Sequence, residues 1–142
     1  MYRVFVFGTL KDGFPNHAVN QGRRLPGTFR TCAPLPLYLV GERCSPWLLD
    51  QPGEGHQVLG EVFEVDADGL AAMDVLERVD RADGYQRVEI DVEPCDAAAP
   101  GGGLRVHAYL KAPRQLLPDM QRLGPLAVYT LEHARLYKPR QG

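Results

Sequence analysis

A continuous apolar run near the start of the chain predicts a strand that is buried on both faces. Residues 4–7 are all β-branched or aromatic, with no polar residue to face water. The run stops at Gly8, and a second glycine follows at Gly13. A glycine-flanked turn after a buried strand can present backbone N–H groups to an anion, and Gly8 has no Cβ to keep a ligand away. An ordinary turn after a core strand fits the same pattern, because the segment matches no established phosphate-binding glycine motif.

The remaining strands are predicted from alternating or short apolar segments. Their expected ranges are residues 27–32, 35–40, 58–65, 85–93 and 104–110. Gly60, inside the segment 58–65, indicates a β-bulge or a close approach of another backbone. The last two strands form a long hairpin, whose loop of residues 94–103 is rich in Ala, Gly and Pro and is expected to be mobile. Residues 23–26 are interpreted as a surface connection, and residues 44–49 as a short apolar patch.

One segment has the pattern of an amphipathic helix. Asp66 is a typical N-cap for a helix over residues 67–79. The apolar stripe of this helix consists of Leu70, Ala72, Met73, Leu76 and Val79. Short helical turns are expected within residues 16–22 and 125–135, and residues 137–140 should be extended. Successive strands without helices between them favour an antiparallel sheet, and the glycines suggest that it curls into a barrel, so the predicted fold class is α+β.

Composition narrows the possible partners. A chain of 142 residues fits a single domain, residues 1–142, and its net charge of −2 with no basic stripe argues against nucleic acid. The apolar runs are too short to span a bilayer, and the immediate start of a strand after Met1 predicts no signal peptide. Three cysteines without a CxxC pair indicate reduced thiols in the cytoplasm. The oligomeric state stays open, with a monomer favoured.

Several common catalytic arrangements are missing from the sequence. Ser45 is the only serine and Pro46 follows it, so no nucleophile elbow of a serine hydrolase can form. The histidines stand alone, without the spacing of metal ligands: His17, His56, His107 and His133. We therefore expect no metal and no cofactor.

One carboxylate stands out on the predicted helix. At 3.6 residues per turn, Glu77 falls between Leu70 and Met73 on the helical wheel, at the edge of the stripe that faces the core. Burial there would raise the pKa of the carboxyl group toward neutrality, which suits a general acid or base. A structural role is the alternative: a glutamate at the helix end that pairs with Arg78 or Arg87.

An ordered set of short motifs resembles the gamma-glutamylcyclotransferase-like superfamily, and within it the gamma-glutamylaminecyclotransferase branch. The motifs run from residue 4 to about residue 140: Phe7-Gly8-Thr9-Leu10, Lys11-x-Gly13, Pro15-Asn16-His17, Pro46-Trp47-Leu48-Leu49, Pro52-Gly53, Gly60-Glu61-Val62, Asp74 to Glu77, Tyr85-Gln86-Arg87 and Tyr137-x-Pro139-Arg140. The family has tyrosine where this chain has Phe7, so the ring is kept and a hydroxyl is lost. The resemblance implies a small mixed, mainly antiparallel β-barrel with a few short helices packed outside.

The resemblance also implies a reaction: cyclisation of a gamma-glutamyl group to 5-oxoproline with release of an amine, for example from gamma-glutamyl-ε-lysine. Glu77 would be the catalytic acid/base. The substrate-binding residues would be Phe7, Gly8, Thr9, Leu10, Tyr85 and Tyr137. The substrate's own α-amine attacks, so the chemistry needs no protein nucleophile, metal or cofactor. Two alternatives remain: the same chemistry on a different gamma-glutamyl substrate, and a non-catalytic domain that binds a small anion or a partner at the same barrel mouth.

Overall fold

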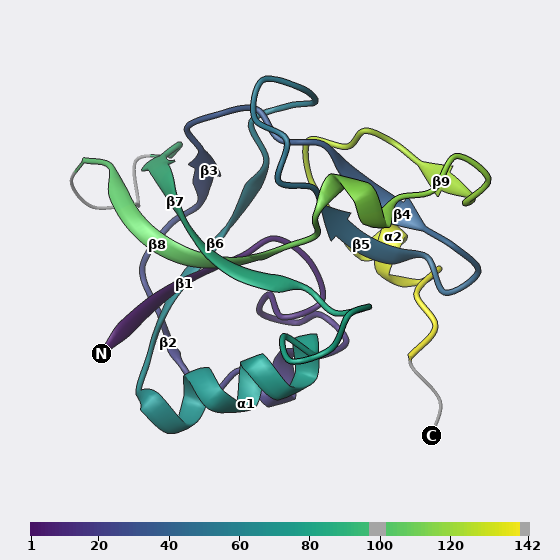
Figure 1. The fold of residues 1–142 in the computed structure, drawn as a ribbon. Helices are drawn as coiled ribbons and strands as arrows, with labels where there is room; N and C mark the ends of the chain where they lie inside the picture. Colours follow the sequence, from purple (N-terminus) through teal and green to yellow (C-terminus); the bar gives the residue numbers. More distant parts are fainter. Residues whose placement is uncertain (97–101, 140–142) are drawn as a thin grey trace.

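The computed structural model describes residues 1–96 and 102–139, and it forms a closed β-barrel of five strands (Figure 1). The strands follow in the order β1 (Tyr2–Val6), β8 (Leu104–Leu110), β7 (Gln86–Pro94), β3 (Phe29–Thr31) and β6 (Leu59–Val65). Pairing of β1 with β6 closes the ring. β1 and β8 run parallel and the other pairs are antiparallel, so the barrel is mixed. The predicted fold class is therefore confirmed.

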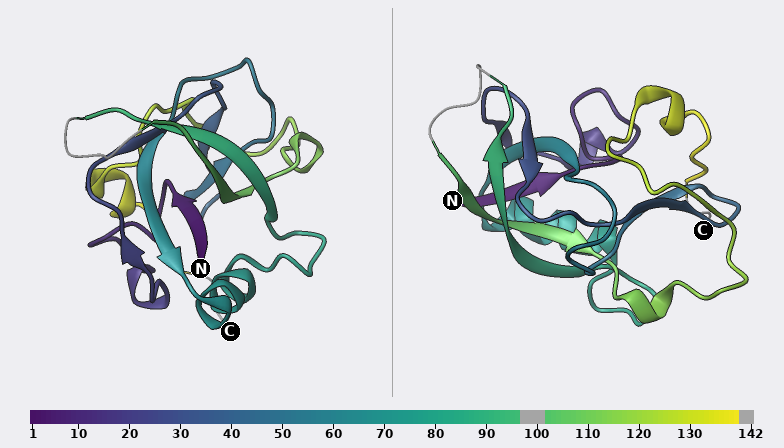
Figure 2. Two further views of the ribbon diagram at one scale, coloured as in Figure 1. Left: turned by 90° about the vertical axis from the view of Figure 1, so that its left-hand side faces the viewer. Right: turned by 90° about the horizontal axis from the view of Figure 1, so that it is seen from above.

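A small sheet and a few short helices lie outside the barrel (Figure 2). The small sheet has the order β5 (Ser45–Leu48), β4 (Leu37–Val40) and β9 (Arg122–Leu123), and the strand β2 (Arg23–Arg24) adds to the edge of β6. The short helices are η1 (His17–Val19), η2 (Pro113–Gln115) and α2 (Leu131–Ala134). Backbone pairing of Leu49 with Lys111 joins the small sheet to the end of β8.

β1 is buried on both faces, as its sequence predicts. Phe5 and Phe7 point into the cluster that fills the barrel, where they pack with Phe29. Val4 and Val6 belong to a second cluster, between the barrel wall and the helix α1 (Ala67–Glu77). The alternation of side chains along a strand thus divides one apolar run between two hydrophobic cores.

The helix α1 begins where the sequence predicts and ends two residues earlier. The Asp66 carboxylate caps it by accepting a hydrogen bond from the Gly69 N–H at 2.8 Å. Arg78 adopts a left-handed conformation with φ 56°, and its N–H donates to the carbonyl oxygens of the preceding turn, which closes the helix at Glu77. Ala72 is exposed, so its assignment to the apolar stripe was wrong.

Other elements differ in extent from the prediction. The apolar patch of residues 44–49 contains the strand β5, and the surface connection of residues 23–26 contains β2. Gly60 marks a close approach, because a Cβ there would lie 2.4 Å from the Val6 carbonyl oxygen. The hairpin of β7 and β8 pairs from Gln86↔Leu110 to Val92↔Leu104. Residues 97–101 of its loop, and Arg140 in the segment expected to be extended, lie outside the described residues.

Candidate functional site

A cavity of about 930 Å³ opens where the barrel meets the small sheet. All the site residues predicted from the sequence line it: Phe7, Gly8, Thr9, Leu10, Glu77, Tyr85 and Tyr137. They come from the turn after β1, the end of α1, the start of β7 and the C-terminal segment. The structure therefore brings together residues up to 130 positions apart in the sequence, and their individual roles stay predictions.

The turn after β1 supplies backbone donors to this cavity. The Lys11 N–H donates to the Gly8 carbonyl at 3.1 Å, and the Asn16 N–H donates to the Thr9 carbonyl at 2.8 Å. In the described part of the chain, none of the N–H groups of Gly8, Thr9 and Leu10 donates to a backbone carbonyl. A Cβ at Gly8 would lie 2.8 Å from the Pro46 ring, so the missing side chain makes room for that proline. Consecutive free N–H groups of this kind bind anionic oxygens.

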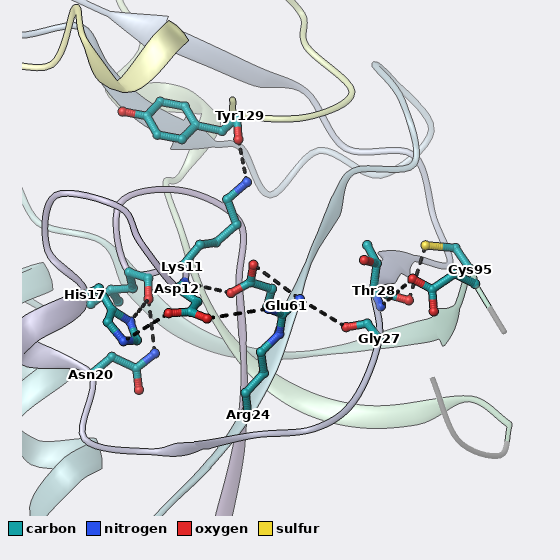
Figure 3. A network of polar contacts seen from close by, with 12 residues as sticks. Lys11, Asp12, His17, Asn20, Arg24, Gly27, Thr28, Glu61, Cys95 and Tyr129 are labelled. Atoms are coloured by element: carbon teal, nitrogen blue, oxygen red, sulfur yellow. Dashed lines mark hydrogen bonds and ion pairs between the residues drawn. The ribbon is translucent and has the colours of Figure 1, made fainter. Parts of the chain in front are cut away.

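Contacts on its outer side hold this turn in place (Figure 3). The Asn20 side chain donates to the Leu10 carbonyl at 3.1 Å, and the Asp12 N–H donates to the Glu61 carboxylate at 2.8 Å. The Lys11 ammonium donates to the Tyr129 carbonyl of the C-terminal segment. Burial lowers the pKa of Lys11 to about 8, although the Glu61 carboxylate acts in the opposite direction. Lys11 does not line the cavity, so it positions the turn rather than a ligand.

Glu77 is half-buried in the last turn of α1, at the cavity wall. Its carbonyl accepts the Tyr85 N–H at 2.9 Å, so the connection from α1 to β7 returns to the helix end. The Tyr85 hydroxyl donates to the Pro46 carbonyl at 2.7 Å. Tyr85 thus links the helix end that carries Glu77 to the strand that packs on Gly8.

Gly84 packs closely against Arg78 at the end of α1. The path of the connection from α1 to β7 depends on this close packing. A Cβ at position 84 would lie 1.7 Å from the Arg78 carbonyl oxygen, a rigid backbone atom. We expect Gly84→Ala to destabilise the fold by about 1–3 kcal/mol and to displace Tyr85, because the loop must open to relieve the overlap. Urea unfolding measures the stability. Gly102→Ala is the matched control, because a Cβ there meets nothing within 4 Å; equal stability of the two variants would contradict the expectation.

Asp74 holds the same end of α1 on the barrel. Its carboxylate accepts a hydrogen bond from the Tyr109 hydroxyl at 2.7 Å and one from the Arg87 guanidinium at 3.0 Å. Burial, together with this carboxylate, raises the pKa of Tyr109 well above its usual value. Asp74 lies three positions before Glu77, so these contacts fix the orientation of the turn that carries the candidate base.

Several cavity residues were missed by the sequence analysis. The Asn16 amide donates to the Thr9 hydroxyl at 2.8 Å and to the Tyr137 hydroxyl at 3.3 Å, where the Arg43 guanidinium also donates at 3.3 Å. Lys111, 3% exposed, also lines the cavity. Asn16 belongs to the motif Pro15-Asn16-His17 of the resemblance but was not predicted as a site residue. No sequence pattern marks a lysine after a strand as one. Among residues 1–96 and 102–139, no group of three or more His, Cys, Asp or Glu could hold a metal ion.

Comparison with known proteins identifies the family. The sequence profile of the family described as gamma-glutamyl cyclotransferase, AIG2-like, matches residues 4–137. The chain belongs to this family. Gamma-glutamylaminecyclotransferases from Rattus norvegicus and Homo sapiens are 37% and 35% identical to it, each over 99% of both chains. The crystal structure of an AIG2-like protein from Mus musculus covers 100% of this chain and 98% of its own, with a TM-score of 0.84 and 34% identity.

The family assignment agrees with the resemblance seen in the sequence. Because relatives named for the activity match along their whole length, the protein is an enzyme of the gamma-glutamyl cyclotransferase type. In the part of the chain that the structure describes, no helix has the length and apolar character needed to cross a membrane.

Proposed function

We propose that the cavity converts a gamma-glutamyl amine to 5-oxoproline and a free amine, with gamma-glutamyl-ε-lysine as the leading candidate substrate. The observation that carries the proposal is one cavity lined both by a half-buried glutamate, Glu77, and by the turn of residues 8–10 with its N–H groups. The names of the rat and human relatives favour a gamma-glutamyl amine as the substrate.

In the proposed mechanism the substrate supplies its own nucleophile. Glu77 takes a proton from the α-ammonium, and the freed amine attacks the γ-carbonyl carbon to close a five-membered ring. The attack forms the new C–N bond and a tetrahedral intermediate. Glu77 then gives its proton to the leaving nitrogen as the old amide C–N bond breaks. It next takes the second proton from the ring nitrogen and passes it to the released amine, which leaves as its ammonium form. Holding the two ends of the glutamyl group together can be worth roughly 7–11 kcal/mol. The N–H groups of Gly8, Thr9 and Leu10 stabilise the oxygen that becomes negative in the intermediate.

The aromatic residues have a separate role in this proposal. Phe7, Tyr85 and Tyr137 form apolar walls around the reacting group, which exclude water and strengthen the electrostatic contacts inside the cavity. Tyr137 is held by Asn16 and Arg43, so it supplies a fixed wall on the side of the turn. Phe7 keeps the aromatic ring of the family's tyrosine. It can therefore form its part of the apolar cavity wall, but it offers no hydroxyl group.

The test is incubation of the protein with gamma-glutamyl-ε-lysine and assay of the products. We expect 5-oxoproline and lysine in equal amounts, and no glutamate, because the α-amine and not water attacks. The α-N-acetylated substrate is the control, since its nucleophile is blocked and it should give neither product. If a panel of gamma-glutamyl amines also gives no 5-oxoproline, the cyclotransferase proposal is wrong and a domain that only binds its ligand becomes the better explanation.

A further inference from the structure

A buried lysine, Lys111, lies in the cavity wall. Lys111 follows β8, and its backbone bonds to the small sheet: its N–H donates to the Leu48 carbonyl at 2.8 Å, and its carbonyl accepts the Asp50 N–H at 2.9 Å. The ammonium group donates to the Asp83 carbonyl at 2.6 Å. It lies 4.3 Å from the centre of the Trp47 ring and 4.6 Å from that of Tyr85. The position of this positive charge is therefore fixed by the barrel, the small sheet and the loop before β7.

An ammonium in such a place needs compensation for its lost hydration, and the Asp83 carbonyl and the Trp47 and Tyr85 rings contribute to it. Removing a charge from water is unfavourable unless aromatic faces, hydrogen bonds or an opposite charge compensate for it. The chain has three lysines, and two of them are buried. Lys11 is turned to the Tyr129 carbonyl and lies outside the cavity, whereas Lys111 lines it. The Lys111 charge can therefore act on a molecule bound in the cavity.

A cation in this part of the cavity would favour the proposed chemistry. In a gamma-glutamyl group, the α-carboxylate and the α-ammonium are attached to the same carbon, so a substrate whose amine reaches Glu77 also brings its carboxylate close to Glu77. Two carboxylates in a desolvated site repel each other strongly. Lys111 contacts Tyr85, and the Tyr85 N–H bonds to the Glu77 carbonyl, so the ammonium belongs to the same wall as the candidate base.

We propose that Lys111 binds the α-carboxylate of the glutamyl group. The proposal rests on the proposed function. It extends that function by assigning the α-carboxylate and the γ-carbonyl oxygen of the substrate to two different groups of the protein. Lys111 holds the carboxylate that is negative throughout the reaction. The N–H groups of residues 8–10 then serve the γ-carbonyl oxygen, which becomes negative only during the reaction. A full charge suits the first task, and aligned neutral donors suit the second.

The test compares two substrates that differ only in the α-carboxylate. One is gamma-glutamyl-ε-lysine, and the other is its 4-aminobutanoyl analogue, which would cyclise to 2-pyrrolidinone. We expect wild-type kcat/KM to favour the first substrate by roughly 30-fold or more, as for a buried charge pair. Lys111→Met should lose most of this preference while changing the rate with the analogue much less. Lys111→Arg, which keeps the charge, should retain part of it.

The ratio of the two kcat/KM values is measured within one variant. A lower fraction of folded protein reduces both values equally and therefore cancels in the ratio. Arg105→Met is the control: it removes an exposed positive charge on β8 outside the cavity and should leave the preference intact. If Lys111→Met lowers both rates equally, Lys111 only supports the wall and the proposal fails. A third substrate, gamma-glutamyl-cadaverine, lacks the carboxylate on the leaving amine. If the effect of Lys111→Met vanishes with that substrate instead, Lys111 binds the leaving amine and the proposal is overturned.

Product binding separates this inference from the proposed function. If the wild type turns over none of these substrates, the cyclotransferase proposal fails by itself. The affinities of the wild type and Lys111→Met for 5-oxoproline and 2-pyrrolidinone are then compared by calorimetry. Selective loss of 5-oxoproline binding supports the carboxylate site, and an equal effect on the two ligands contradicts it.

Discussion

Replacing Glu77 by glutamine should lower kcat for 5-oxoproline release by roughly 10²–10⁴-fold, the usual contribution of a general acid or base. Glutamine keeps the size of the side chain but cannot take the proton from the substrate's ammonium or return it to the leaving amine. Because Glu77 is half-buried at the cavity wall, the melting temperature and the affinity for 5-oxoproline should change little. The measurements are steady-state kinetics, thermal unfolding and calorimetry on one preparation.

Glu89→Gln is the matched control, because Glu89 is exposed on β7 and does not line the cavity. It should retain wild-type turnover. Full activity of Glu77→Gln would remove Glu77 from the mechanism. A large drop in melting temperature together with unchanged specific activity would instead favour the structural role that the sequence left open.

The stability of the protein should increase between about pH 8 and pH 10.5 because of Lys11. Burial lowers the pKa of this lysine from 10.5 to about 8, so in this range the unfolded chain binds a proton that the folded chain has released. The free energy of unfolding therefore rises with pH, by about 3 kcal/mol in total at 1.36 kcal/mol per pH unit. Below pH 8 both states are protonated and the contribution is constant.

The measurement is the difference in unfolding free energy between the wild type and Lys11→Met, from urea titrations at pH 7.5 to 10.5. Other titrating groups, including the buried Tyr109 and Tyr129, are present in both proteins and cancel in the difference. Lys11→Arg, which keeps a charge that does not titrate in this range, should give the same slope. A difference that is independent of pH would show that Lys11 titrates as it does in the unfolded chain.

The parts of the site that sequence could predict are those fixed by local patterns. The position of Glu77 followed from helical periodicity, since Leu70 and Met73 had to face the core and the glutamate fell between them. The turn at Gly8 followed from the abrupt end of an apolar strand. Both sets of residues line the cavity, because α1 packs against β1 and β6 and thereby brings the helix end to the tip of the first strand.

Features that depend on distant contacts could not be read from the sequence. Lys111 is buried where the chain just after β8 pairs with Leu49, the residue after β5. β5 itself, which contains Pro46, becomes a strand by pairing with β4 and not through strand propensity. The parallel pairing of β1 with β8 was also missed, since alternation reveals a strand but not its neighbour.

The position of β1 has a consequence for how the chain acquires its structure. β1 is made first, yet one of its two neighbours, β8, is completed only at Leu110. A nascent chain that lacks β8 can pair β1 with β6 but cannot close the ring, and it leaves an apolar strand edge uncovered. Such long-range pairing slows folding and lengthens the time during which the chain can aggregate. Chaperone dependence during synthesis should therefore last until the last barrel strand has left the ribosome.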